Sequence, residues 1–173
     1  MGLADVAYRK VKQLSGGMVR RLGVAQALVH EPRILVVDEP TVGLDPEERI
    51  RFRKLMEEIG RDRTILLSTH IVADLGASCR EISILDSGRT VFAGSPAELF
   101  RSSVGAVFEL ITSVEMADKA EQNHEVVSRI SAGDQVTLRA IASENGMPPG
   151  ATRVDETTLE ESCMAFMSAR GRA

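Results

Sequence analysis

Short apolar runs alternate with stretches of helical periodicity over the first part of the chain. Residues 34–38 (Ile-Leu-Val-Val-Asp) and 64–68 (Thr-Ile-Leu-Leu-Ser) are short and apolar at their centres. This pattern predicts two buried strands of a parallel sheet. Residues 15–29 and 46–60 repeat apolar positions at helical spacing, which predicts two helices. The order helix, strand, helix, strand indicates a parallel sheet with covering helices.

Both predicted helices begin with residue types that are typical of helix caps. Ser15 precedes the first helix and is a plausible N-cap. Asp45, Pro46 and an acid at the third helical position start the second helix. The residues expected to face inward are Met18, Leu22, Ala25, Leu28 and Val29 in the first helix, and Ile50, Leu55 and Ile59 in the second.

The next segment predicts a short helix and then a hairpin. Residues 71–79 form the expected short helix, and strands at 82–85 and 90–93 flank Ser87-Gly88, which is typical of a tight turn. Ser95 and Glu98 have the spacing of a capping box and open another short helix that reaches Phe100.

The pattern changes near Ser102-Ser103, where we place a boundary between residues 1–100 and 101–173. The second part predicts a small α+β unit. Its expected strands are 107–112, 126–130 and 136–141, its expected helices are 116–122 and one capped by Thr158, and a loop surrounds residues 145–150.

Composition narrows the class of protein. The chain has 173 residues, 43% hydrophobic, with a net charge of -4, so nothing in its charge indicates a nucleic-acid partner. Aromatic residues make up 3% and Trp is absent, so platforms for stacking bases are not evident. Cys79 and Cys163 are isolated, which favours inert thiols in a reducing cytosol. No apolar run approaches the length that spans a bilayer, and we expect a cytoplasmic chain.

Two adjacent carboxylates, Asp38 and Glu39, end the first apolar run. Open α/β sheets bind their ligands at this end of the strands. Burying carboxylates is costly unless a cation or proton chemistry compensates. On its own, the segment is better interpreted as a strand that simply ends in a polar turn.

Four short motifs in a fixed order resemble the second half of an ATP-binding cassette (ABC) ATPase. Residues 14–18 (Leu-Ser-Gly-Gly-Met) resemble the signature motif, and residues 34–39 resemble Walker B with its following glutamate. Residues 43–46 (Gly-Leu-Asp-Pro) resemble the D-loop, and residues 68–70 (Ser-Thr-His) resemble the switch histidine. The resemblance implies an α/β fold, part of a P-loop-type parallel sheet, with the small α+β appendage behind it.

The resemblance also implies roles for single residues. Asp38 would reach Mg²⁺, and Glu39 would orient or deprotonate the water that attacks ATP. His70 would contact the γ-phosphate and sense its loss. The structural alternatives are a cap or salt-bridge role for Glu39 and a packing role for His70; His30 and His124 are assigned no role.

Ser15, Gly16 and Gly17 would cradle a γ-phosphate held by the other subunit of a dimer, since they combine a hydroxyl, bare backbone N–H groups and a helix N-terminus. A plain helix cap with a Gly-Gly turn is the alternative. Asp45 would serve the dimer interface, the helix cap, or both. Met18 stands where the family usually has Gln, which removes one possible polar contact to the ribose.

Two further features refine the resemblance. The chain has no Gly-Lys pair, so it lacks the phosphate-binding loop of such ATPases, and we expect a C-terminal fragment of a subunit. Residues 157–167 resemble the tail of ABC-2-type exporter ATPases, although residues 162–165 depart from it; a generic amphipathic helix is the alternative.

The sequence therefore predicts a nucleotide-binding subunit fragment of an ABC exporter. The complete subunit would bind ATP and Mg²⁺, pair with a second ATPase subunit, and drive a separate membrane permease from the inner face of the membrane. This chain alone would be inactive. The alternatives are a soluble, non-transport ABC ATPase and a truncated, non-enzymatic chain.

Overall fold

The computed structural model describes residues 1–75, 79–143 and 146–171. The chain divides into two compact units, residues 1–78 and 79–173, and each is described by itself. The expected boundary near Ser102-Ser103 lies inside the second unit. The division into residues 1–100 and 101–173 stays a prediction.

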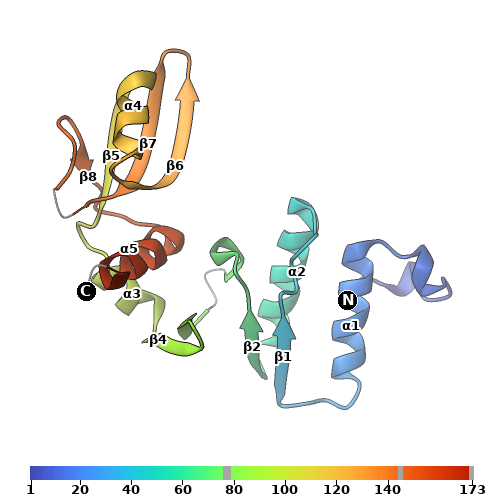
Figure 1. The fold of residues 1–173 in the computed structure, drawn as a ribbon. Coiled ribbons are helices and arrows are strands. Elements are labelled where there is room, and N and C mark those ends of the chain that lie inside the picture. Colours follow the sequence, from blue (N-terminus) through green and yellow to red (C-terminus); the bar gives the residue numbers. More distant parts are fainter. Residues whose placement is uncertain (76–78, 144–145, 172–173) are drawn as a thin grey trace. The chain divides into compact units, whose positions relative to one another are not determined.

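The first unit is built on a parallel pair of strands, β1 (Ile34–Asp38) and β2 (Thr64–Ser68). The register places Leu35 opposite Ile65 and Asp38 opposite Ser68. Figure 1 shows α1 (Gly16–Leu28) and α2 (Pro46–Ile59) beside this pair. The predicted α/β order, the parallel pairing and both helices are confirmed. Three short 3₁₀ turns are also present: η1 (Ala4–Val6), η2 (Val11–Gln13) and η3 (Val72–Leu75).

The two helices cover one face of the strand pair. The buried core there consists of Val24, Leu35, Leu44, Phe52, Met56 and Ile59. The inward positions expected for the helices are partly wrong, because Leu22, Val29 and Ile50 are exposed. The spacing of apolar residues identifies a helix, but in both helices more than one stripe is apolar, and the phase is decided by packing.

The other face of β1 and β2 is uncovered within the described part of the chain. Ile34, Val36 and Leu66 are 63%, 67% and 62% exposed, while Leu35, one position along, is buried. The expectation that both strands are buried is therefore wrong for one face. A strand alternates its side chains between the two faces of the sheet, and the helices cover a single face.

The second unit begins with an antiparallel hairpin of β3 (Ile82–Asp86) and β4 (Arg89–Gly94). Ser87 and Gly88 both have positive φ angles, 49° and 76°, as a tight hairpin turn requires. The predicted hairpin is confirmed. The short helix α3 (Pro96–Ser102) follows, with the predicted Ser95–Glu98 capping box. Of the helix expected at 71–79, the structure shows the η3 turn, and residues 76–78 lie outside the described residues.

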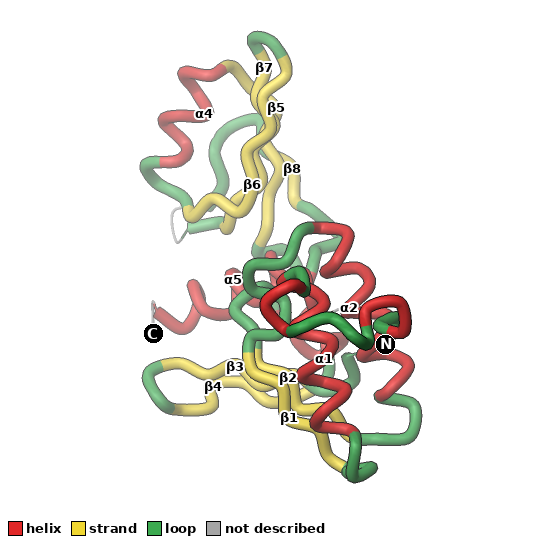
Figure 2. Tube along the Cα trace, turned by 90° about the vertical axis from the view of Figure 1, so that its right-hand side faces the viewer, coloured by secondary structure: helices red, strands yellow, loops and turns green. Residues whose placement is uncertain are grey.

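A four-stranded antiparallel sheet forms the rest of the second unit, in the order β6-β7-β5-β8. Helix α4 lies along one side of it (Figure 2), and Ala120 of α4 packs with Phe108 and Leu138. The predicted α+β appendage is confirmed. Its elements are β5 (Val107–Ser113), α4 (Val114–Glu121), β6 (Glu125–Ala132), β7 (Gln135–Ile141), β8 (Thr152–Arg153) and α5 (Leu159–Gly171). The two-residue β8 was not expected, because it is too short to show any periodicity.

The last helix, α5, is held by aromatic and polar contacts. The rings of Phe92 and Phe166 meet edge to face at 5.4 Å between centroids. Glu161 is buried and pairs with Arg139 at 3.0 Å between Oε1 and Nε. The Thr158 hydroxyl accepts the Glu161 N–H at 3.2 Å, so the predicted cap of this helix is confirmed.

Both cysteines lie in this unit. Burial raises the pKa of the Cys79 thiol and of the Cys163 thiol. Because the thiolate is the reactive form, this agrees with the expectation of inert thiols. Among the described residues, no helix combines the length and the apolar character that crossing a bilayer needs.

Candidate functional site

The carboxyl ends of β1 and β2 bring four polar residues together. Because the strands are parallel and end in the same register, Asp38 lies opposite Ser68. The Ser68 hydroxyl donates a hydrogen bond to Asp38 Oδ1. The backbone N–H of Glu39 donates to Ser68, to its Oγ at 3.2 Å and to its carbonyl at 3.1 Å. Ser68 therefore connects the two acids.

Glu39 and His70 are in direct contact. Glu39 Oε1 accepts the His70 backbone N–H at 3.1 Å and lies 2.8 Å from His70 Nδ1. Glu39 also has a left-handed backbone, with φ of 43°, a conformation that costs a non-glycine residue free energy and often occurs at functional sites. The structure thus joins the two residues that the sequence suggested as catalytic, from segments 31 positions apart.

The second carboxylate oxygen of Glu39 is free to accept a hydrogen bond. Glu39 Oε2 is buried and has no partner among the described residues. Since buried polar atoms are normally satisfied, this acceptor suits a water molecule or a donor from a bound molecule. The salt-bridge alternative for Glu39 stays a prediction: one oxygen contacts the His70 ring, while the other is buried and unpaired among the described residues.

Sequence reasoning missed the role of Ser68, which it treated only as part of the Ser-Thr-His motif. The sequence feature that could have indicated this role is the equal length of the two predicted strands. Two parallel strands of five residues that begin in register also end in register, so Asp38 and Ser68 must be neighbours.

The Ser15–Gly17 segment forms the N-terminus of α1, away from β1 in sequence. The Ser15 hydroxyl accepts the Met18 N–H at 3.2 Å, which confirms the predicted cap. Ser15 and Gly16 are exposed, and a side-chain carbon at Gly16 would meet no atom within 4 Å. An anion can therefore approach this helix end closely, where N–H groups and the helix dipole favour negative charge.

Asp45 caps α2 in the same manner. Its carboxylate accepts the Glu48 N–H at 2.8 Å, and the residue itself is exposed. The cap role is therefore confirmed, and the role at a dimer interface stays a prediction.

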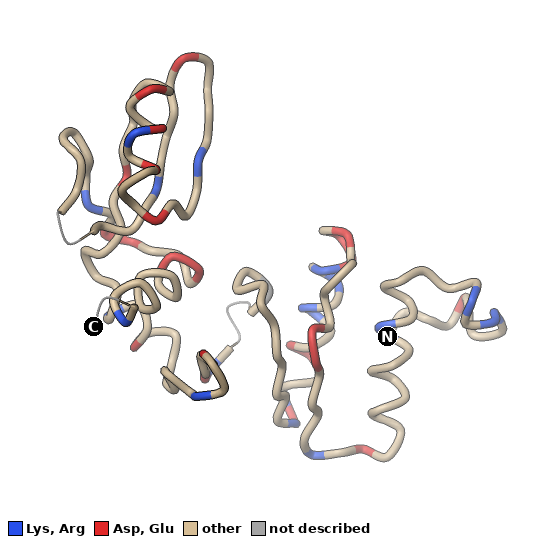
Figure 3. Tube along the Cα trace, in the orientation of Figure 1, with Lys and Arg blue, Asp and Glu red and all other residues tan. Residues whose placement is uncertain are grey.

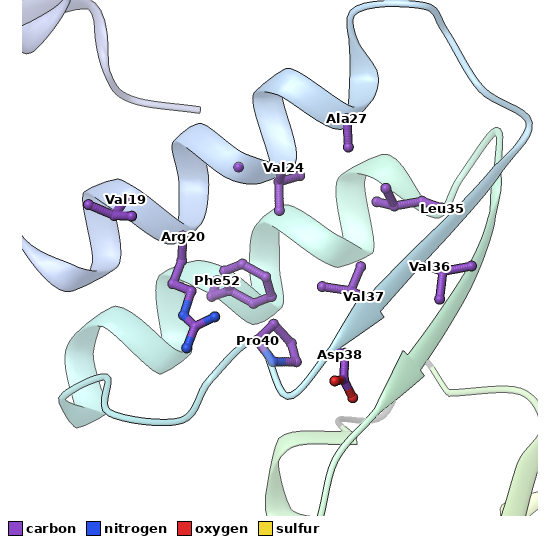
Figure 4. A pocket seen from close by; sticks show the side chains of 11 residues that line it. Val19, Arg20, Val24, Ala27, Leu35, Val36, Val37, Asp38, Pro40 and Phe52 are labelled. Atoms are coloured by element: carbon purple, nitrogen blue, oxygen red, sulfur yellow. The ribbon is translucent and has the colours of Figure 1, made fainter. Parts of the chain in front are cut away.

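A cavity of about 390 Å³ lies between α1, α2 and β1. Figure 4 shows that Val24, Leu35 and Phe52 line it, with Arg20 and Asp38 among the lining residues. One arginine is too little positive charge for a triphosphate, so this cavity is not a complete nucleotide site.

Asp38 is the residue that suits a divalent cation. It is exposed at the strand end, and among the described residues no group of three His, Cys, Asp or Glu side chains could hold a metal ion. Mg²⁺ is usually held by one or two carboxylates together with water and the phosphates of a substrate. A single carboxylate therefore fits Mg²⁺ that arrives with a nucleotide, rather than a metal held by the chain alone.

Comparison with known proteins gives consistent results. Residues 1–42 match the family described as ABC transporter. "Nod factor export ATP-binding protein I" of Paraburkholderia xenovorans (strain LB400) is 40% identical over 104 residues, which are 60% of this chain and 34% of that protein. The protein of the same name from Rhizobium johnstonii (strain DSM 114642 / LMG 32736 / 3841) is 40% identical over 104 residues, 60% of this chain and 33% of that protein. The chain thus spans about a third of the length of these curated relatives.

A solved structure of an ATP-binding cassette of an ABC transporter is 24% identical, with a TM-score of 0.47, and covers 50% of this chain and 35% of that chain.

Proposed function

We propose that this chain is a segment of an ABC transporter ATP-binding subunit and that it takes part in ATP hydrolysis by a dimer that drives export. The observation that carries this proposal is the state of Glu39. One of its oxygens is held by His70, and the other is buried and without a partner among the described residues. This is the arrangement of a fixed carboxylate with one acceptor left for a water molecule.

In this proposal, Glu39 accepts a proton from the attacking water or orients it. His70 holds the Glu39 carboxylate through its N–H and ring nitrogen, and its ring is exposed, so it would be available to contact a terminal phosphate. Asp38 would hold Mg²⁺, which when bound offsets the negative charge of the phosphates. Ser68 keeps Asp38 and the Glu39 backbone in fixed positions.

We assign Ser15, Gly16 and Gly17 to the nucleotide of the partner subunit. The open α1 N-terminus and the bare Gly16 support this role. Asp45, which caps α2 and is exposed, would contact the partner at the same interface. These 173 residues contain no Gly-Lys pair, so they do not supply the phosphate-binding loop.

Export through a separate permease is the part of the proposal that rests on the relatives. They are named for Nod factor export, and residues 157–167 resemble an exporter tail. A permease partner would place the subunit at the inner face of the membrane. The names of the relatives favour this over a non-transport ABC ATPase.

The test uses a hybrid subunit, in which the 104 matched residues of the Paraburkholderia xenovorans relative are replaced by those of this chain. Glu39→Gln in the hybrid should lower the rate of ATP hydrolysis by roughly 100-fold or more, the usual size for a general base. ATP binding should persist, because the amide keeps the shape and the contact to the His70 N–H.

Phosphate release measures the rate, and a fluorescent nucleotide measures binding. Glu57→Gln on the exposed side of α2 is the matched control and should change neither. Near-normal turnover in the Glu39→Gln hybrid would show that Glu39 is not the base and would make His70 the next residue to test.

A further inference from the structure

The first turns of α1 and α2 meet at one side chain, Glu48. Its backbone N–H is already used, since it donates to the Asp45 carboxylate. Its own carboxylate points to α1, with Oε2 at 3.4 Å from Arg21 Nη2, and to Arg51, with Oε1 at 3.2 Å from Nη1. The side chains of Arg21 and Glu48 are only 11% and 17% exposed, so this ion pair lies largely away from solvent.

The Glu48 carboxylate occupies the space where a side chain at position 17 would lie. A side-chain carbon at Gly17 would lie 2.2 Å from Glu48 Oε2 and 2.7 Å from its Cδ. The φ angle of Gly17 is not in the left-handed region, so the backbone does not require glycine there. The constraint on residue 17 comes instead from the close approach of the Glu48 carboxylate.

Arg21 extends this contact along α1. Its Nε donates to the Gly17 carbonyl at 3.4 Å, and its Nη1 donates to the Met1 carbonyl at 3.3 Å. Glu48 therefore contacts the N-terminal part of α1 in two ways. Its carboxylate lies beside the Cα atom of Gly17, and it forms an ion pair with Arg21. Largely buried pairs lose much more on removal of one partner than exposed pairs do, so the contact can hold two helices in register.

We infer that Glu48 is a positioning residue that fixes the α1 N-terminus, with Ser15–Gly17, against the first turn of α2, with Asp45. The inference rests on the proposed function, in which both segments face a partner subunit. Glu48 itself would touch neither nucleotide nor partner. It would make two short segments, far apart in the sequence, into one preformed surface.

The first experiment measures the contact in the 173-residue chain without nucleotide. Gly17→Ala should lower the Tm of the first unit by roughly 4–8 °C, the shift that a destabilisation of about 1 kcal/mol gives in a domain of this size. Hydrogen exchange at the Met18 amide should become faster. In a Glu48→Ala background the same Gly17→Ala change should be neutral or raise the Tm, because alanine is the better helix former once the carboxylate is gone.

The Gly17→Ala and Glu48→Ala changes form a double-mutant cycle, and its matched control uses Glu47→Ala in place of Glu48→Ala. Glu47 is the neighbouring acid, is 75% exposed and pairs with Arg51. Gly17→Ala should lower the Tm by the same amount in the Glu47→Ala background as in the wild type. If the effects of Gly17→Ala and Glu48→Ala simply add, the inferred contact is absent and the inference is overturned.

The second experiment tests positioning in the hybrid subunit, with hydrolysis blocked by Glu39→Gln. Glu48→Gln keeps the size of the side chain but removes the charge that holds Arg21. It should weaken ATP-dependent dimerisation about tenfold, measured by size-exclusion chromatography, and leave ATP binding to the monomer unchanged. Glu47→Gln should alter neither. A purely structural effect would lower both quantities together, so equal loss of ATP binding and dimerisation overturns the positioning role, as does dimerisation equal to that of Glu47→Gln.

Failure of the proposed function would look different. If the hybrid without any change at position 48 does not dimerise on ATP, the cross-subunit function fails and the positioning role fails with it. The Gly17–Glu48 coupling is still measured, because the first experiment needs no nucleotide.

Discussion

At the scale of single residues, the adjacent glycines 16 and 17 are glycine for different reasons. Gly17 is buried and faces the Glu48 carboxylate. Gly16 is exposed and meets no atom that would exclude a side chain. The described residues therefore crowd the second glycine and not the first, and we propose the approach of an outside molecule as the reason for Gly16.

Gly16→Ala should separate stability from binding. Because the site is open and helical, alanine should leave the free energy of unfolding unchanged or raise it by up to about 1 kcal/mol, measured by urea denaturation of the chain. In the hybrid subunit with Glu39→Gln, the added methyl group should reduce ATP-dependent dimerisation. Unimpaired dimerisation would mean that Ser15–Gly17 is only a helix cap. Gly23→Ala, equally open but in the middle of α1, is the control and should dimerise normally.

At the scale of elements, four helices begin with a side-chain cap that the sequence predicted. Ser15, Asp45, Ser95 and Thr158 each accept the N–H of the residue three positions on. Such caps satisfy N–H groups that have no partner within the helix. Along α2, acidic residues lie near both ends and basic residues lie between them (Figure 3), and Arg51 pairs with both Glu47 and Glu48.

The capping box of α3 gives a prediction of pH dependence. The Ser95 backbone N–H, and then its hydroxyl, lower the pKa of Glu98 below its ordinary value of 4.5. A carboxylate with a lowered pKa adds its stabilisation fully above the ordinary pKa and loses it as the pH falls through the folded pKa. We therefore expect the α3 cap to weaken only in acid, below pH 4.5.

The Ser95→Ala variant tests this. It removes the hydroxyl but keeps the backbone N–H, so the pKa of Glu98 should rise part of the way to its ordinary value, measured by NMR titration of the side-chain carboxyl carbon. Ser113→Ala is the matched control, because Ser113 precedes α4 without a side-chain cap bond, and it should leave Glu98 unchanged. An identical Glu98 titration in both variants would contradict the capping box.

At the scale of the whole molecule, the first unit presents a sheet with one face packed and one open. Ile34, Val36 and Leu66 lie on the open face, and parallel sheets are usually covered on both. The matched relatives are about three times as long as the segment they share with this chain. The proposed nucleotide site is likewise partial, since Asp38, Glu39 and His70 lie together while no Gly-Lys pair is present.

We therefore predict that the 173-residue chain alone neither binds ATP tightly nor hydrolyses it. The phosphate-binding loop supplies most contacts to the β- and γ-phosphates, and the cavity beside β1 offers Arg20 as its single cation. Calorimetry with Mg-ATP measures this directly, with the hybrid subunit as the positive control. A dissociation constant in the micromolar range for the chain alone would contradict the prediction.

The sequence by itself determined the local features of this protein. The helix caps at Ser15 and Asp45, the Ser87-Gly88 turn, the end of β1 at Asp38 and the start of β2 at Thr64 depend on neighbouring residues, and all of them are present. The order of the motifs also indicated which acids and which histidine to consider, because a motif is a short stretch of chain.

Only the tertiary structure decided which of these residues meet. Contacts such as Glu39–His70 and Gly17–Glu48 join segments about 31 residues apart, and they depend on the register of two strands and on the rotation of two helices. Phe52 is buried and Ile50 is exposed although both are apolar, because the packing of α2 on the sheet fixes which stripe faces inward. Sequence periodicity indicates whether a segment forms a helix or a strand. Which of its residues are buried, and which residues they contact, is decided by the free energy of packing the elements together.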